Sequence, residues 1–315
     1  MSPPDPPTSS DPSAFSACSP SASAALPAGL RLPGWARKGS PLAPAARAVR
    51  VLLREQGLNT VCEEARCPNL GDCFSRGTAT FMLLGDRCTR RCGYCSVATA
   101  RPQPPDAGEP DRVAEAAARL GLRYVVLTAV ARDDLDDGGA SHFAAAVRAV
   151  RRRRPGARVE VLVPDFRGER PALESVLGAG PDVFNHNIET VPRLFPRVRP
   201  QGGYSRSLAM LGMARALRPA QAVKSGLMVG LGETDDEIAS VLGDLRAAGV
   251  DIVTIGQYLR PTRDHVPVER YVSPEGFGAL ERRARALGFP TVYSGVFVRS
   301  SFNAEEVFTT IPAAH

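Results

Sequence analysis

Residues 80–95 read TFMLLGDRCTRRCGYC, an apolar run that leads directly into a loop of closely spaced cysteines. Thr80–Gly85 has the composition of a buried strand. The loop after it has the spacing C-x3-C-x2-C, formed by Cys88, Cys92 and Cys95. A second triplet precedes it with the spacing C-x4-C-x5-C, formed by Cys62, Cys67 and Cys73. Each iron of a four-iron cluster needs an external ligand, so either triplet would leave one iron open for chemistry.

Two other uses of clustered cysteines compete with this interpretation. A closed zinc site needs four Cys or His ligands, and the four histidines lie far from both triplets in sequence: His142, His186, His265 and His315. One zinc ion bound by cysteines from both triplets remains an alternative. Disulfide frameworks are typical of short secreted chains, whereas this chain has 315 residues. We therefore expect a reducing compartment and metal binding, with Cys18 incidental.

Residues 1–28 are dominated by Pro, Ser and Ala, a composition that predicts a disordered tail. The tail lacks the basic and apolar regions of a secretory signal. It contains Asp5 and Asp11, and the first arginine is Arg31, whereas a transit peptide is Arg-rich and poor in acids. We expect a cytoplasmic protein, with an organelle matrix as the alternative. No apolar run approaches the roughly 18 residues that span a bilayer, so no membrane partner is expected.

The net charge of +6 is modest, and the densest basic run is Arg151–Arg154. We interpret this run as the end of a helix that begins near Ser141, because cations stabilise helix carboxyl ends and Pro155–Gly156 follows. No aromatic residues interleave with these arginines. We therefore expect no nucleic-acid partner.

Short β-type runs alternate with helical patterns from residue 80 onward, which predicts an α/β fold with a parallel sheet. Thr234 and Glu237 form a capping box for one helix, and Ser273–Pro274 begins another. Periodicity leaves a barrel or an open sheet equally possible. In either, ligands bind at the carboxyl ends of the strands. The six expected strands are Thr80–Gly85, Tyr124–Thr128, Arg158–Val163, Asp182–Asn185, Val223–Val229 and Asp251–Gln257.

The loop CTRRCGYC resembles the signature of the radical S-adenosylmethionine (SAM) enzymes. In that superfamily the open iron binds the amino and carboxylate groups of SAM, and an electron from the cluster releases a 5′-deoxyadenosyl radical. Tyr94 occupies the position where the superfamily often has an aromatic residue. The resemblance implies that Cys88, Cys92 and Cys95 are catalytic.

From about Leu32 to Glu305 the chain resembles the lipoyl synthase family. The resemblance implies a partial (β/α)6 TIM-type barrel at 80–290. An N-terminal extension at 29–79 and a C-terminal extension at 291–315 would hold an auxiliary cluster. The matching blocks are CEEARCPNLGDC, RGTATFMLLGDRCTRRCGYCSVATARP, LTAVARDDLDDGGA, FNHNIETVPRLFPRVRP, KSGLMVGLGE, GQYLRPTRDHVPVERYVSPEGF and YSGVFVRSSFNAE.

The activity implied is sulfur insertion at C6 and C8 of an octanoyl group bound to a lipoyl carrier domain. The carrier would be the glycine cleavage H protein or a 2-oxoacid dehydrogenase E2 subunit. The implied cofactors are SAM and two [4Fe–4S] clusters, with the auxiliary cluster as the sulfur donor and flavodoxin or ferredoxin as the electron donor. An aliphatic C–H bond is beyond acid–base chemistry, so a cofactor must supply the radical.

The resemblance also implies site residues. The auxiliary cluster would be held by Cys62, Cys67, Cys73 and by Ser301, the second serine of the family's RSSY motif. This chain has Phe302 in place of the tyrosine, which loses a hydroxyl. Polar residues that follow expected strands are candidate SAM contacts, although each could instead be a helix cap or a loop hydrogen bond: Asp133, Asp134, Asn185, Asn187 and Glu189.

Other radical enzymes that insert sulfur are the nearest alternatives. Biotin synthase scatters the cysteines of its second cluster among the barrel strands, whereas no cysteine follows Cys95 in this chain. Methylthiotransferases carry extra cysteines in a whole preceding domain, for which too little sequence precedes Cys88. A zinc-dependent nucleic-acid-binding protein is the alternative from another class.

Overall fold

The computed structural model describes residues 31–37, 44–64, 67, 69–75 and 80–301. The expected disordered tail, Cys18, Phe302 and His315 lie outside these ranges. The chain divides into two units, Met1–Arg31 and Leu32–His315.

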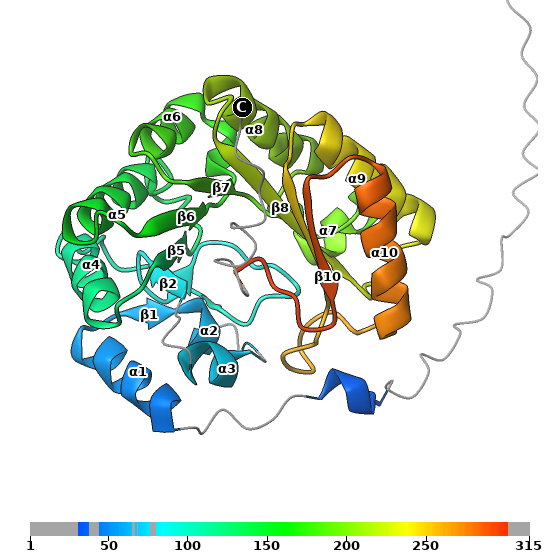
Figure 1. Ribbon diagram of the computed structural model, residues 1–315, viewed down its shortest axis with the longest axis horizontal. Coiled ribbons are helices and arrows are strands. Elements are labelled where there is room, and N and C mark those ends of the chain that lie inside the picture. Colours follow the sequence, from blue (N-terminus) through cyan, green and yellow to red (C-terminus); the bar gives the residue numbers. More distant parts are fainter. Residues whose placement is uncertain (1–30, 38–43, 65–66, 68, 76–79, 302–315) are drawn as a thin grey trace, which may run out of the picture. The chain divides into compact units, whose positions relative to one another are not determined.

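An eight-stranded sheet forms the centre of this unit, in the order β1-β2-β5-β6-β7-β8-β9-β10. Neighbours from β2 to β10 are parallel, and β1 runs antiparallel to β2. The strands curve round a common interior, and helices cover the outside (Figure 1). The strands of this sheet are β1 Asn59–Thr60, β2 Thr80–Leu83, β5 Tyr124–Ala129, β6 Arg158–Leu162, β7 Val183–Asn185, β8 Ala222–Val229, β9 Ile252–Gln257 and β10 Thr291–Gly295.

A helix connects each parallel strand to the next, which confirms the predicted partial (β/α)6 barrel. These connecting helices are α4 Glu109–Arg119, α5 Ala140–Arg153, α6 Arg170–Gly178, α8 Tyr204–Leu217, α9 Asp235–Ala247 and α10 Pro274–Ala286. The remaining elements are α1 Pro44–Glu55, α2 Val61–Glu64, α3 Leu70–Ser75, α7 Phe195–Val198, the ribbon of β3 Arg87–Cys88 and β4 Ala98–Thr99, and 3-10 turns at Gly34–Ala36, Phe166–Gly168 and Pro192–Leu194.

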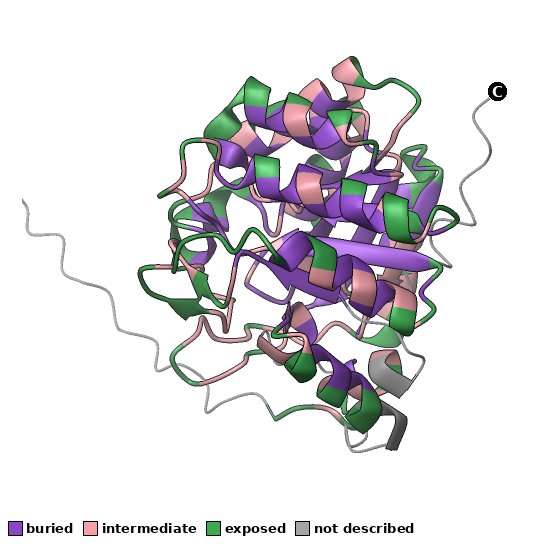
Figure 2. Ribbon diagram, turned by 90° about the vertical axis from the view of Figure 1, so that its left-hand side faces the viewer, coloured by how far each residue is buried: buried purple, intermediate pink, exposed green. Residues whose placement is uncertain are grey.

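Buried apolar strands and amphipathic helices account for this arrangement. Figure 2 shows the strands buried and the helices exposed on their outer sides. In α9 the predicted capping box is present, because Thr234 Oγ1 accepts from Glu237 N and Glu237 Oε2 accepts from Thr234 N. One face of α9 is then fully buried, through Ile238, Val241, Leu242 and Leu245.

The six expected strands are all present, with ends that differ by at most two residues. In addition, β10 pairs in parallel with β9, with Thr291 opposite Ile252. The resemblance implied that this segment belongs to the C-terminal extension. The segment contains Ser294 and Gly295, which are weak strand formers, and its extended form depends on a tertiary partner.

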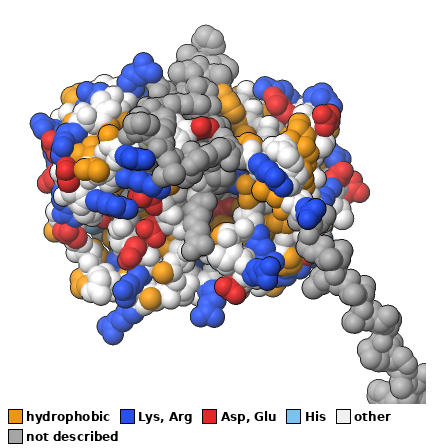
Figure 3. Space-filling model, turned by 90° about the horizontal axis from the view of Figure 1, so that it is seen from below, with side chains coloured by type: hydrophobic (Ala, Val, Ile, Leu, Met, Phe, Trp, Pro, Cys, Tyr) orange, Lys and Arg blue, Asp and Glu red, His pale blue; other side chains and the backbone are white. Residues whose placement is uncertain are grey.

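The basic run Arg151–Arg154 lies at the carboxyl end of α5, as expected. Three of its arginines have acidic partners, since Arg151 pairs with Asp182, Arg152 with Asp111 and Arg153 with Glu115. The face drawn in Figure 3 also shows basic and acidic side chains interspersed over the described residues. None of the described helices combines the length and apolar character that a membrane-spanning helix needs.

Candidate active site

A cavity of about 460 Å³ lies at the carboxyl ends of the parallel strands. This volume is typical of small-molecule sites, which span roughly 300–1,000 Å³. Its wall includes the ends of β2, β5, β6, β8 and β9, the cysteine loop, and residues 298–301. Members of both cysteine triplets border it: Cys67, Cys88, Cys92 and Cys95. The two cysteine triplets, which are separate in sequence, therefore both contribute to the wall of this cavity.

A left-handed turn at the end of β2 directs the chain into the cysteine loop. Leu84 has φ of 68° and Gly85 has φ of 89°, a region that bulky residues rarely adopt. The Leu84 N–H donates to Glu109 Oε2 over 2.8 Å, and the same oxygen lies 2.6 Å from His142 Nε2. The buried Glu109 and His142 pair thus holds the strained turn from which the loop departs.

The backbone of the cysteine loop is fixed from two sides at Gly93. Gly93 N donates to Val198 O over 2.8 Å, and Gly93 O accepts from Val266 N over 2.9 Å. A Cβ at this position would lie 2.9 Å from Arg197 O and 2.9 Å from Val266 Cγ1, which is too close for any side chain. Glycine is therefore required by the close approach of both neighbouring segments.

The thiols of this loop are only partly accessible. Cys88 Sγ accepts from Ala131 N over 3.3 Å and from Arg90 N over 3.4 Å. Burial raises the pKa of Cys92 to about 11 and that of Cys95 to about 12. Without metal these thiols are protonated near neutral pH, so metal binding must release protons.

Local backbone hydrogen bonds connect the cysteines of the first triplet, which precedes β2, to nearby residues. Cys67 N donates to Cys62 O over 3.1 Å, and Cys73 N donates to Asn69 O over 2.9 Å. Burial, and next the charge of Cys67, raise the pKa of Cys62 to about 12. Asn69 Nδ2 donates to Phe297 O over 2.7 Å, which joins this triplet to the C-terminal segment.

The donor set and its spacing fit iron–sulfur clusters. Among the described residues, no three His, Cys, Asp or Glu side chains converge as the ligands of one metal ion would. In a cluster each thiolate binds its own iron, so the sulfur atoms stand apart.

The five candidate SAM contacts divide into two groups. Asn187 and Glu189 line the cavity. Burial raises the pKa of the Glu189 carboxyl, and the nearby Arg199 opposes this shift. Asp133, Asp134 and Asn185 are not part of the described cavity wall.

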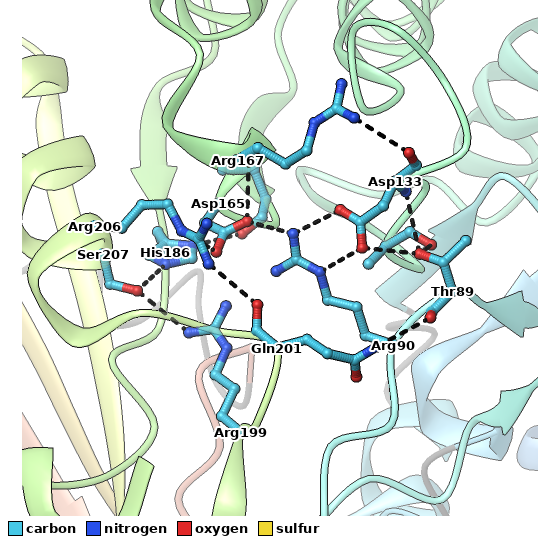
Figure 4. A network of polar contacts seen from close by, with 12 residues as sticks. Thr89, Arg90, Asp133, Asp165, Arg167, His186, Arg199, Gln201, Arg206 and Ser207 are labelled. Carbon is cyan, nitrogen blue, oxygen red and sulfur yellow. Dashed lines mark hydrogen bonds and ion pairs between the residues drawn. The ribbon is translucent and has the colours of Figure 1, made fainter. Parts of the chain in front are cut away.

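The side chains of this second group have other partners. Asp133 bonds Arg90 over 2.7 Å (Figure 4), and Asp134 bonds Arg132 over 2.8 Å. Asn185 Nδ2 donates to the buried Glu160 over 2.8 Å, and Glu160 also accepts from Lys224 and Tyr124.

Arg199 is a cavity residue that sequence reasoning missed. It is 7% exposed and lines the cavity. Its Nη1 donates to Asn187 O over 3.0 Å and to Ser207 Oγ over 3.4 Å. Its charge lowers the pKa of Cys92, against the larger effect of burial. Nothing in the sequence distinguishes this arginine from its exposed neighbours in the block PRLFPRVRP.

Both ring nitrogens of His186 have hydrogen-bond partners within the protein. Its Nδ1 lies 2.8 Å from Val163 O and its Nε2 lies 2.9 Å from Ser207 Oγ (Figure 4). Because the carbonyl only accepts, Nδ1 carries the proton and Nε2 accepts from the hydroxyl. Burial, and next the charge of Arg199, lower the pKa of His186 to about 3.

Comparison with known proteins gives consistent results. The radical SAM superfamily matches residues 82–256. The lipoyl synthase of Rubrobacter xylanophilus is 55% identical over 87% of this chain and 85% of its own length. The lipoyl synthase of Methylococcus capsulatus is 56% identical over 88% and 86%, and that of Thermus thermophilus 54% over 88% and 86%.

Two solved structures share the fold. Methylornithine synthase superposes with a TM-score of 0.51 and 14% identity, over 76% of this chain and 73% of that one. A maturase of the [FeFe]-hydrogenase has a TM-score of 0.51 and 16% identity, over 85% of this chain and 70% of that one. At these identities the likeness concerns the fold alone.

Proposed function

The chain belongs to the lipoyl synthase family of the radical SAM superfamily, and on this basis we propose distinct roles for its two cysteine triplets. The enzyme is a sulfurtransferase that inserts two sulfur atoms into a protein-bound octanoyl group to give the lipoyl cofactor. It uses SAM and a [4Fe–4S] cluster.

Cys88, Cys92 and Cys95 hold the cluster that binds SAM, as we propose. The observation that carries this assignment is the cavity, where the three thiols lie at the carboxyl ends of the strands together with Asn187 and Glu189. The cluster and SAM, when bound, supply the radical that removes hydrogen from an unactivated carbon. Asn187 and Glu189 are the polar groups positioned to contact SAM, and the apolar strand ends exclude water.

The remaining ligands form a second cluster site. Cys62, Cys67 and Cys73 supply three thiolates and Ser301 supplies the fourth ligand. Cys67 and Ser301 line the same cavity, and the Asn69–Phe297 hydrogen bond brings their two segments together. This second cluster, when bound, is the sulfur source. A serine oxygen is a less favoured iron ligand than a thiolate, so the bond to Ser301 would be the easiest to release.

The substrate is an octanoylated protein. We propose a lipoyl carrier domain, either the glycine cleavage H protein or a 2-oxoacid dehydrogenase E2 subunit, and flavodoxin or ferredoxin as the electron donor. A cytoplasmic location, where thiols stay reduced, suits both clusters.

Anaerobic reconstitution followed by mass spectrometry of an octanoylated carrier peptide tests the proposal. We expect about eight iron and eight sulfide per chain, because each cube has four of each, and a product that carries two added sulfur atoms. One or two zinc ions with no sulfide would refute the cluster assignment. Intact clusters and SAM cleavage without any change in the peptide would refute the substrate.

A further inference from the structure

Arg90 is a buried cation inside the cysteine loop, between Cys88 and Cys92. Its side chain is 5% exposed. Its Nε donates to Asp133 Oδ2 and its Nη2 to Asp133 Oδ1, both over 2.7 Å, and Nη2 also donates to Asp165 Oδ1 over 2.6 Å. Figure 4 shows the guanidinium between the two carboxylates. A guanidinium held in this way has a fixed orientation as well as a fixed distance.

The two carboxylates come from different strand ends. Asp133 follows β5, and Asp165 follows β6. Asp165 is fully buried, and its other oxygen lies 3.0 Å from Arg206 Nε. The backbone N–H of Arg167 also donates to Asp165, over 3.2 Å. Asp165 is therefore held independently of the cysteine loop and can serve as a fixed anchor for it.

The segment after β5 contacts the same part of the loop through its backbone. Thr89 N donates to Ala131 O over 3.1 Å, and Asp133 N donates to Thr89 Oγ1 over 3.1 Å. Ala131 N in turn donates to Cys88 Sγ over 3.3 Å. Any displacement of Arg90 relative to Asp133 would therefore move the Cys88 sulfur atom as well.

We propose that Arg90 is a positioning residue, whose fork to Asp133 and Asp165 sets the placement of the Cys88 and Cys92 thiols for cluster binding. The inference rests on the proposed function, in which these cysteines hold a cluster. In this proposal Asp133 positions the cysteine loop through Arg90 and does not contact SAM. Groups that orient metal ligands typically change metal affinity by about 10- to 100-fold when removed.

The test compares Arg90→Lys and Arg90→Gln with a matched control, Arg151→Gln. Arg151 also binds a carboxylate, Asp182, over 2.7 Å, but at the amino ends of β6 and β7, away from the cavity. The reconstituted full chain is exposed to an iron chelator. SAM should change the EPR signal of the reduced cluster that the second triplet holds. We therefore follow the loss of this SAM-responsive signal over time.

We expect both Arg90 variants to lose the SAM-responsive signal about 10- to 100-fold faster than the wild type, and Arg151→Gln at the wild-type rate. Lysine keeps the charge but cannot form the fork. Wild-type behaviour of Arg90→Lys would therefore overturn positioning by the fork. A wild-type protein that shows no SAM-responsive signal would instead contradict the proposed function, whatever the Arg90 variants do.

A second measurement separates positioning from general stabilisation. Hydrogen exchange of the cluster-free chain is compared between the wild type and Arg90→Gln. Faster exchange confined to peptides from residues 86–97 and 131–135 supports positioning. Faster exchange throughout the barrel strands would overturn it, because Arg90 would then stabilise the whole fold.

Discussion

The side-chain amide of Asn187 donates a hydrogen bond to Ser300 Oγ over 3.2 Å, across 113 positions of sequence. This bond joins the segment after β7 to residues 298–301, which line the cavity. Ser300 therefore has a protein partner in the cavity wall, and its neighbour Ser301 is the serine that we assign to the auxiliary cluster.

The two serines should respond differently to substitution. Ser301→Ala should still assemble a cluster, because three thiolates remain, but should form little product. Ser300→Ala should lose only its hydrogen bond, worth about 1 kcal/mol, and retain most activity. Product yield per chain, measured at equal iron content, distinguishes them. An inactive Ser300→Ala beside a normal Ser301→Ala would place the ligand one residue earlier.

The two cysteine triplets should be separable by assay. Alanine at Cys88, Cys92 and Cys95 should abolish 5′-deoxyadenosine formation, because no site for SAM cleavage remains. Alanine at Cys62, Cys67 and Cys73 should leave that cleavage measurable but stop sulfur insertion. Both variants are assayed for 5′-deoxyadenosine and for lipoyl product. Normal lipoyl formation in the second variant would remove the sulfur-donor assignment.

Gly256 offers a way to displace the C-terminal segment without altering any proposed ligand. A Cβ at Gly256 would overlap the carbonyl oxygen of Val298. That oxygen belongs to the backbone, so it cannot move aside by a side-chain rotation. Gly256→Ala should therefore shift residues 298–301 and reduce sulfur insertion more than SAM cleavage. Gly243→Ala in α9 is the control, since nothing lies within 4 Å of its added Cβ. Equal losses of both activities would contradict this expectation.

Local signals allowed the sequence to predict the strands, the α9 capping box and the cysteine loop, because each depends on residues close together in the chain. The partners of Arg90 could not be predicted in this way, since Asp165 is 75 positions away. Asn185 and Asn187 illustrate a second limit. A continuing strand would place both on one face, but β7 ends at Asn185. Asn185 therefore contacts Glu160, whereas Asn187 lines the cavity.

His186 should make the cluster-free protein sensitive to acid. Its pKa is about 3 in the folded state, against 6.5 ordinarily. Between these values the unfolded state binds a proton that the native state does not, so stability is complete above pH 6.5 and falls as the pH decreases toward 3. At pH 5 the loss should be about 2 kcal/mol. In urea titrations at pH 7.5 and 5, the stability advantage of the wild type over His186→Gln should shrink; an unchanged advantage would contradict the assignment.

Thr234→Ala should destabilise the fold by about 1 kcal/mol, because it removes the hydroxyl that caps α9. Ser240→Ala, an exposed position in the same helix, should be neutral or slightly stabilising because alanine is the better helix former. The free energy of unfolding from urea titration checks both. A similar loss in the two variants would mean that the cap contributes nothing.

The hydrogen bond from Asn69 to Phe297 spans 228 positions, and it constrains how the enzyme matures. On the ribosome, the first triplet emerges long before the segment that carries Phe297. The loop of the second triplet likewise reaches its final position only after Val266 has been synthesised, because the Val266 N–H donates to Gly93 O. Contacts of such high sequence separation cannot form before both segments have been synthesised. If both triplets hold clusters as proposed, iron and sulfide must be delivered to an almost complete polypeptide, because an interrupted translation product lacks the residues that surround each triplet.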